Sequence, residues 1–239
     1  MRSFVYVIAI GLMAFACLNS AQAAAPPVGW SGYIQLGGVQ TTGNTESSTA
    51  DGKFKLNYLR DPWQNTFRLS GLYASSYGTT SAQSWEGSNQ ARYSYTKHNY
   101  LFGLLNAQAV RFSGYDYQVS EVAGLGRRLY DTARQTLDVE AGVGARQSRL
   151  TQGVAQDTAI ARLGAGYEFD ISSHSMFSQH VSAEIGKDNT YIKSVSGLKM
   201  SIYGALSANL TYTVTHNSNV PAGTRKTDTI SSVTLEYDF

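Results

Sequence analysis

The sequence predicts an all-β fold, a transmembrane antiparallel up-and-down β-barrel of about 12 strands. Three observations predict it. Apolar and polar residues alternate with a period of two in many segments of the chain. No apolar run after residue 23 approaches the ~20 residues that a membrane helix needs. The last residue, Phe239, is an aromatic that ends such an alternating segment.

The final segment shows the alternation most clearly. Val233, Leu235, Tyr237 and Phe239 fall on one face, and the residues between them are polar. Successive side chains of a strand point to opposite faces, so one face would meet lipid and the other the interior. By analogy with other outer-membrane barrels, we expect these four residues to be the signal that the barrel-assembly machinery recognises.

Turn residues divide the rest of the chain into twelve expected strands. Residues 24–239 divided among them leave room for membrane strands of ~9–11 residues plus connections, with ten or fourteen strands as the alternatives. Residues 100–112 and 117–130 carry apolar residues on both faces, which indicates either a bulge or an interior packed with side chains. The expected strands are 30–40, 47–59, 64–77, 84–96, 100–112, 117–129, 135–149, 156–169, 175–187, 191–201, 205–216 and 227–239.

The expected connections alternate in length. Short turns such as Arg60–Pro62 would face the periplasm together with both termini, and longer stretches such as Gly78–Gln83 and Asn217–Lys226 would face outward. Outer-membrane barrels have this arrangement. Aromatic residues near strand ends would form a girdle at the lipid headgroups: Trp30, Tyr58, Trp63, Tyr100 and Tyr130.

Residues 1–23 have the three parts of a cleaved signal peptide. Arg2 precedes an apolar run from Phe4 to Leu18, and Ala21-Gln22-Ala23 forms the cleavage site. The barrel is therefore expected to span residues 24–239 of an exported protein in the outer membrane. An uncleaved anchor helix and lipidation at Cys17 are the alternatives.

The composition excludes several classes of site. The only cysteine, Cys17, leaves with the signal peptide, so the mature chain has no disulfide or thiolate metal site. The chain has 19 basic and 17 acidic residues, and cleavage also removes Arg2. This near-neutral balance shows no basic stripe for nucleic acid. The histidines show no metal-ligand spacing, and no cofactor motif is present.

Several motifs resemble the salt-induced outer-membrane protein family, a domain of unknown function. They are Gly29-Trp30-Ser31-Gly32, Thr42-Gly43-Asn44-Thr45, Phe112–Tyr117, Gly124-Leu125-Gly126 and Thr136–Gly142. The terminal strand fits as well. The resemblance implies an outer-membrane barrel of the envelope with a salt- or stress-related role, and it supplies no catalytic residues.

Charged residues on the polar face of the expected strands would line the lumen. Both signs occur in similar numbers, so they would either close the lumen by pairing or line a narrow pore. Inward glycines such as Gly142, Gly144, Gly164 and Gly166 favour some opening. With Lys53 and Lys55, the expected lumen-lining residues are Arg68, Glu86, Arg92, Asp138, Glu140, Arg146, Arg162, Glu168, Glu184 and Glu236.

One pair of residues suggests an enzyme instead. His180 and Ser182 share one face of a strand, as in a phospholipase barrel that uses His-x-Ser with a supporting Asn. The Asn-Gly that follows that serine is replaced here by Ala183-Glu184, and His180 and Ser182 would face the lumen, away from lipid. A non-enzymatic role is therefore favoured.

Three hypotheses follow. The first is an outer-membrane barrel that acts as a narrow pore for a small solute or ion, or as a structural envelope component. The second is a lipid-active enzyme that uses His180 and Ser182. The third is a soluble periplasmic β-sandwich. The partners expected for the first are outer-membrane lipid and the assembly machinery, with no nucleic acid.

Overall fold

The computed structural model describes residues 29–41, 47–110, 115–151 and 153–239. Twelve strands account for most of this chain, and the described part has no helix long and apolar enough to cross a membrane. The predicted signal peptide and the Thr42–Thr45 motif lie outside the described residues. The strands are β1 (Gly29–Thr41), β2 (Ser47–Arg60), β3 (Trp63–Ser76), β4 (Thr79–Ser94), β5 (Asn99–Val110), β6 (Tyr115–Asp131), β7 (Gln135–Leu150), β8 (Ala155–Ser172), β9 (Ser175–Gly186), β10 (Thr190–Tyr203), β11 (Leu206–Asn217) and β12 (Thr227–Asp238).

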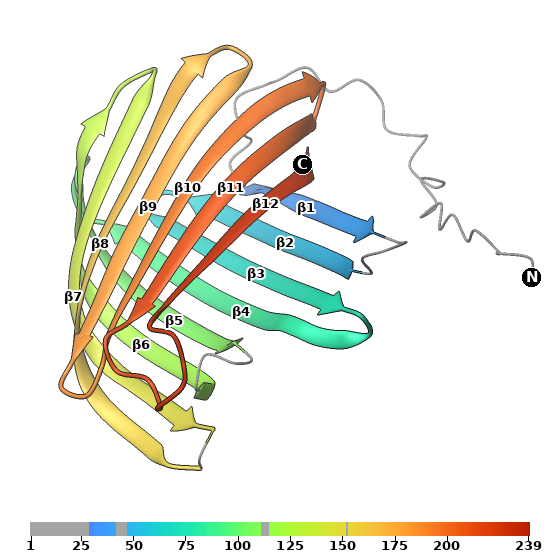
Figure 1. Ribbon diagram of the computed structural model, residues 1–239. Coiled ribbons are helices and arrows are strands. Elements are labelled where there is room, and N and C mark those ends of the chain that lie inside the picture. Colours follow the sequence, from blue (N-terminus) through green and yellow to red (C-terminus); the bar gives the residue numbers. More distant parts are fainter. Residues whose placement is uncertain (1–28, 42–46, 111–114, 152) are drawn as a thin grey trace, which may run out of the picture.

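Each strand pairs antiparallel with its neighbours in sequence, and β12 pairs with β1, so the sheet closes into a barrel (Figure 1). This confirms the predicted fold class and excludes the β-sandwich. We call the end that carries Gly29 and Phe239 the terminal end and the opposite end the loop end. The connections at the terminal end are 61–62, 95–98, 132–134, 173–174 and 204–205.

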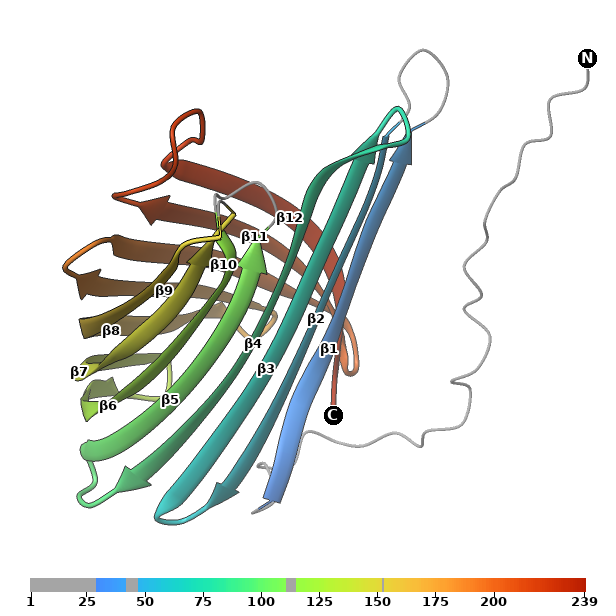
Figure 2. The ribbon, with the colours of Figure 1, turned by 90° about the horizontal axis from the view of Figure 1, so that it is seen from below.

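The seam between β1 and β12 closes the barrel over a short length. Its register runs from Tyr33 opposite Asp238 to Leu36 opposite Leu235. Gly32 and Phe239 add two reciprocal backbone hydrogen bonds of 2.8 and 2.9 Å. Beyond the seam the loop-end halves of β1 and β12 diverge (Figure 2), and each pairs only with its other neighbour.

On the outer face, Phe239 packs over Gly32. An added Cβ at Gly32 would lie 2.9 Å from the Phe239 ring, so only glycine leaves room for this ring. The ring also stacks on Phe54 of β2, with centroids 6.4 Å apart. The last residue of the chain therefore joins β12 to β1 and β2.

The connection between β3 and β4 is shorter than predicted. Residues 78–83 were expected to form a loop, but β4 already starts at Thr79 and only Tyr77 and Gly78 connect the strands. Both residues have positive φ, 48° and 74°. Two such residues form the tight hairpin turn that matches strand twist, which allows pairing to continue to the turn.

The mixed faces predicted in 100–112 and 117–130 have both of the expected causes. Register shifts occur at both ends of β6, between Tyr115 and Tyr117 and between Arg128 and Tyr130. The interior is also packed here by a cluster of apolar side chains from three strands. These are Tyr100, Phe102, Val122 and Ile160, with Leu104 against them.

The seam yields a first prediction. The variant Gly32→Ala places a methyl group 2.3 Å from the Lys55 carbonyl oxygen and against the Phe239 ring. Overpacking of this kind costs about 1–3 kcal/mol. We expect the folded barrel to lose its heat-modifiable gel mobility at a lower temperature.

The matched control is Gly103→Ala, because an added Cβ there meets no atom within 4 Å. A melting temperature of Gly32→Ala equal to that of the control would contradict the role given to the Gly32–Phe239 contact.

Candidate functional site

The barrel is apolar outside and polar inside, so the interior is the candidate site. Outward side chains are highly exposed, for example Val143 at 72% and Leu36 at 67%. Inward charged side chains are buried, with Glu236 at 2% and Arg146 at 4%. A soluble protein has the opposite distribution. An exterior of this kind is stable only when lipid covers it.

Aromatic residues gather on the outer face at the terminal end. Trp30 packs on Tyr58 with ring centroids 4.7 Å apart, and Trp63 packs on Tyr93 at 5.0 Å. Tyr100, predicted to belong to this girdle, instead points inward and is 5% exposed. The inward position follows from the register, which sets Tyr100 opposite Gly126, and that glycine leaves space for the ring.

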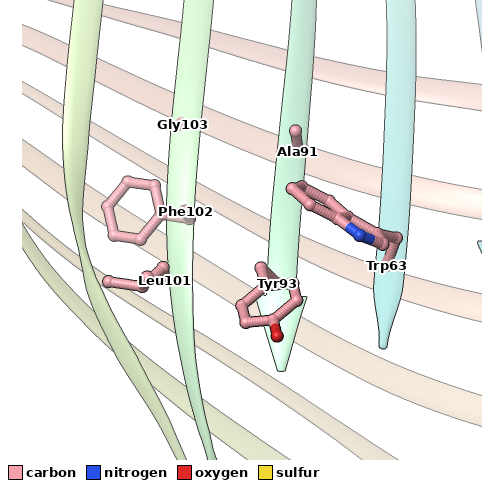
Figure 3. Close-up of a pocket in the computed structure, with 6 residues that line it drawn as sticks. All are labelled: Trp63, Ala91, Tyr93, Leu101, Phe102 and Gly103. Carbon is pink, nitrogen blue, oxygen red and sulfur yellow. The ribbon is translucent and has the colours of Figure 1, made fainter. Parts of the chain in front are cut away.

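A shallow apolar hollow lies beside the Trp63–Tyr93 pair (Figure 3). Its floor is open because Ala91 and Gly103 carry little or no side chain. Leu101 borders it on β5. The hollow opens on the apolar outer face, so it is a surface for lipid chains and no part of the interior.

Inside, Arg92 on β4 reaches β7 across two intervening strands. Its Nη1 lies 2.9 Å from Asp138 Oδ2, and its Nη2 lies 2.8 Å from Glu140 Oε1. The guanidinium also lies over the Tyr100 ring, 4.6 Å from its centroid. Arg128 of β6 donates to Asp138 at 2.8 Å. Arginine suits such sites because its planar fork can serve two carboxylates at once.

Glu140 is the centre of this network. Its carboxylate accepts hydrogen bonds from Gln90 at 2.9 Å and from the Tyr100 hydroxyl at 3.1 Å. Arg162 of β8 pairs with its other oxygen at 3.1 Å. With these partners, a carboxylate only 8% exposed has its charge compensated. Together with the Arg128–Asp138 pair, the network therefore ties the five strands β4 to β8 together from inside.

A second network lies behind the seam. Glu236 of β12 accepts from Gln35 of β1 and, at 2.9 Å, from Asn209 of β11. Lys199 of β10 pairs with Glu236 and, at 2.6 Å, with Asp238. Four strands thus meet at one buried carboxylate on the inner side of the short seam.

One ion pair crosses the lumen. Lys193 of β10 pairs with Glu86 of β4, and these strands are six apart in either direction around the closed order. A round barrel of twelve strands has a backbone diameter of about 24 Å from strand spacing and tilt. Two side chains of this length cannot span it, so the cross-section is flattened here.

Further hydrogen bonds narrow the same region. The Tyr191 hydroxyl of β10 donates to Gln108 of β5 at 3.2 Å, and Gln108 donates to Gln118 at 2.8 Å. Tyr191 is 8% exposed. Together with the Lys193–Glu86 pair, these contacts make a constriction between opposite walls.

The loop end carries a third polar network. Arg146 lies 3.5 Å from Glu184 and donates to the Asn189 carbonyl oxygen at 2.6 Å. Asn189 donates to Asn217 at 2.7 Å. The connection 218–226 extends toward the far wall, because the Tyr115 hydroxyl of β6 donates to the carbonyl oxygen of Asn219 at 3.1 Å. This connection therefore covers part of the mouth.

The space left by the inward glycines is mostly occupied. A Cβ at Gly142 would meet Val122 and the backbone of β6, and one at Gly144 would meet the Glu121 carbonyl oxygen. Those at Gly164 and Gly166 would meet side chains at 3.0–3.3 Å. The sequence predicted that these glycines would open the lumen, but other atoms of the barrel fill most of the space beside them. The glycines let neighbouring strands and side chains approach closely.

The predicted lumen residues separate into groups. Arg92, Asp138, Glu140 and Arg162 share one network, whereas Arg146 and Glu184 belong to the loop-end network. Glu236 lies behind the seam, and Glu86 is in the crossing pair. Arg68 and Glu168 have no ion pair within the described residues. The sequence reading missed Arg128, Lys193 and Lys199. The two lysines lie in β10, where outward Ser194 and Ser196 obscure the alternation.

The enzyme hypothesis gains no support. His180 and Ser182 both lie on the inner face of β9, as predicted. No hydrogen bond joins them in the part of the chain that the structure describes. The same part contains no group of three His, Cys, Asp or Glu residues able to hold a metal ion.

The Glu140 network yields a second prediction. Glu140→Gln keeps the size of the side chain but removes its negative charge. Of the two carboxylates that pair with Arg92, Arg128 and Arg162, only Asp138 would then remain charged. Breaking a buried ion pair costs about 3–5 kcal/mol. We expect the free energy of unfolding in urea to fall by this amount. The control is Asp157→Asn, an exposed carboxylate, which should change it by less than about 0.5 kcal/mol. Equal effects would contradict the central role of Glu140.

The chain is similar to proteins of one family and to solved membrane barrels. A family described as "Protein of unknown function, DUF481" matches residues 34–239. Protein YdiY of Escherichia coli strain K12, described as uncharacterized, is 25% identical over 211 residues, which cover 88% of this chain and 83% of YdiY.

Two solved structures are similar to the chain. The NanC porin is 8% identical with a TM-score of 0.50, over 87% of this chain and 97% of its own. An outer-membrane channel from Pseudomonas putida F1 is 12% identical with a TM-score of 0.49, over 93% and 100%. At 8% identity, the likeness to the NanC porin is one of fold alone.

Proposed function

Because the chain belongs to the family described as "Protein of unknown function, DUF481", we infer its function from the barrel itself. We propose a narrow outer-membrane channel for small polar solutes, constricted by the Lys193–Glu86 pair. The observation that carries this proposal is a charged interior that water reaches. His180 points inward, yet its side chain is exposed.

The constriction supports a narrow channel over a wide one. Lys193 and Glu86 are 24% and 27% exposed, so water borders their contact. An ion pair that borders water is weaker than one that is fully buried, which makes such a contact breakable. The arginine–carboxylate networks lie along the walls, so the Lys193–Glu86 pair and the Tyr191–Gln108 hydrogen bond are left to narrow the lumen between opposite walls.

A third prediction tests the channel. In planar lipid bilayers, the full barrel should show small, steady conductance steps. Lys193→Ala and Glu86→Ala should each raise the step by about twofold or more, because each breaks the ion pair in the constriction and shortens a side chain that fills it. The control is Lys97→Ala, an exposed lysine in a turn at the terminal end. Absence of conductance in all of these proteins would contradict a channel and favour a structural envelope component.

Location and assembly form part of the proposal. Residues 1–23 would direct export, and Val233, Leu235, Tyr237 and Phe239 would be recognised by the assembly machinery. The apolar outer face supports this placement. A role in salt stress rests on the family resemblance, and growth of a deletion strain at raised sodium chloride would test it.

A fourth prediction separates assembly from seam stability. Deleting Phe239 has two effects. It removes the ring that packs on Gly32 and Phe54, and it removes the last residue of the expected assembly signal. Purified protein refolded in detergent should then melt at a lower temperature, as Gly32→Ala does. In cells, the deletion should reduce the folded amount in the outer membrane well below that of Gly32→Ala. Equal amounts of both variants would contradict the recognition role.

A further inference from the structure

Two neighbouring cations in the lumen lack a carboxylate partner. Lys55 of β2 and Arg68 of β3 face each other across the strand pair and point inward. Within the described residues, no carboxylate lies within 4.0 Å of either. Other interior cations have such a partner, namely Arg92, Arg128, Arg146, Arg162, Lys193 and Lys199.

This arrangement is unfavourable unless something compensates it. Like charges directly opposite on a strand pair repel each other. Partial burial adds a desolvation cost that water and distant carboxylates offset only in part. The contact that the structure provides for Lys55 is the Tyr33 ring, with Nζ 5.6 Å from its centroid. Among the described residues, the other interior cations named above are paired, which leaves these two available.

The opposite wall leaves room in front of them. His180 of β9 lies six strands from β3 in the closed order, and its inward side chain is exposed. Its neighbours in the sheet include Gly166, which has no side chain. Because β3 and β9 are half of the closed order of twelve strands apart, they lie on opposite walls of the barrel. The cations therefore border a water-accessible part of the lumen.

We propose that Lys55 and Arg68 form an anion-binding site for a solute that carries a carboxylate or phosphate group. The guanidinium offers a planar fork to two oxygens, and the ammonium adds a point charge. His180 on the facing wall supplies a further hydrogen-bonding group. The site deepens the proposed channel function, because it specifies the charge of the solute that the channel admits.

Calorimetric titration of the purified, detergent-folded barrel tests the site at low salt, where screening is weak. The probes are inorganic phosphate and acetate, which distinguish the two sources of anionic oxygen. We expect the wild-type barrel to bind at least one of them. Lys55→Gln and Arg68→Gln should each weaken binding about tenfold or more, the loss of one charge-assisted hydrogen bond. The control Lys97→Gln/Arg134→Gln, which neutralises two exposed turn cations, should bind like the wild type.

Gel mobility verifies that each variant is folded. If a neutral variant fails to fold, Arg68→Lys keeps the charge, loses the fork, and should weaken binding severalfold. Failure of the wild-type barrel to bind either probe would overturn the site, and so would undiminished binding by the Lys55 and Arg68 variants. Binding without bilayer conductance would leave the site standing and refute the channel.

Discussion

Closure of the sheet is the constraint on which the rest of this structure depends. In lipid, every backbone N–H and C=O needs a partner, so a spanning sheet must leave no edge within the hydrocarbon. Here the sheet is closed by the few residue pairs between β1 and β12. The seam is reinforced on both faces, by Phe239 on Gly32 outside and by the Glu236 network inside. The pairing ends at the Leu36–Leu235 pair, so Val233, the next outward residue of β12, lies beyond it.

The same constraint shapes the interior. Because the exterior of the closed wall is apolar, the polar face of each strand is directed inward. Charged side chains are crowded there, and a buried charge without a partner costs free energy. Most of them form networks that join strands distant in sequence, as Arg92 does with Asp138 and Glu140. These networks follow the wall. The Lys193–Glu86 pair and the loop-end contact of Tyr115 with Asn219 extend across the lumen instead.

Much of this architecture was readable from alternation. The row Val233, Leu235, Tyr237 and Phe239 indicated the outward face of β12, and turn residues together with the chain length gave the strand number. Strand ends were less accurate, as the hairpin at Tyr77 and Gly78 shows, because two residues of positive φ are not apparent in a polar stretch. Tyr100 was placed on the wrong face. Its position depends on the space above Gly126, a residue on a different strand.

Where the alternation is clean, the sequence by itself determined which residues face outward and which face the interior, because the period of two is a local property of each strand. It also determined that the interior would carry both signs of charge in balance. Only the tertiary structure decided which charges meet. Pairing across the lumen depends on the shear and flattening of the closed barrel, and these are properties of the whole sheet that cannot be read from any single strand. For this reason Lys193 pairs with Glu86 on the opposite wall, while Lys55 and Arg68 lie side by side with no carboxylate within 4.0 Å among the residues that the structure describes.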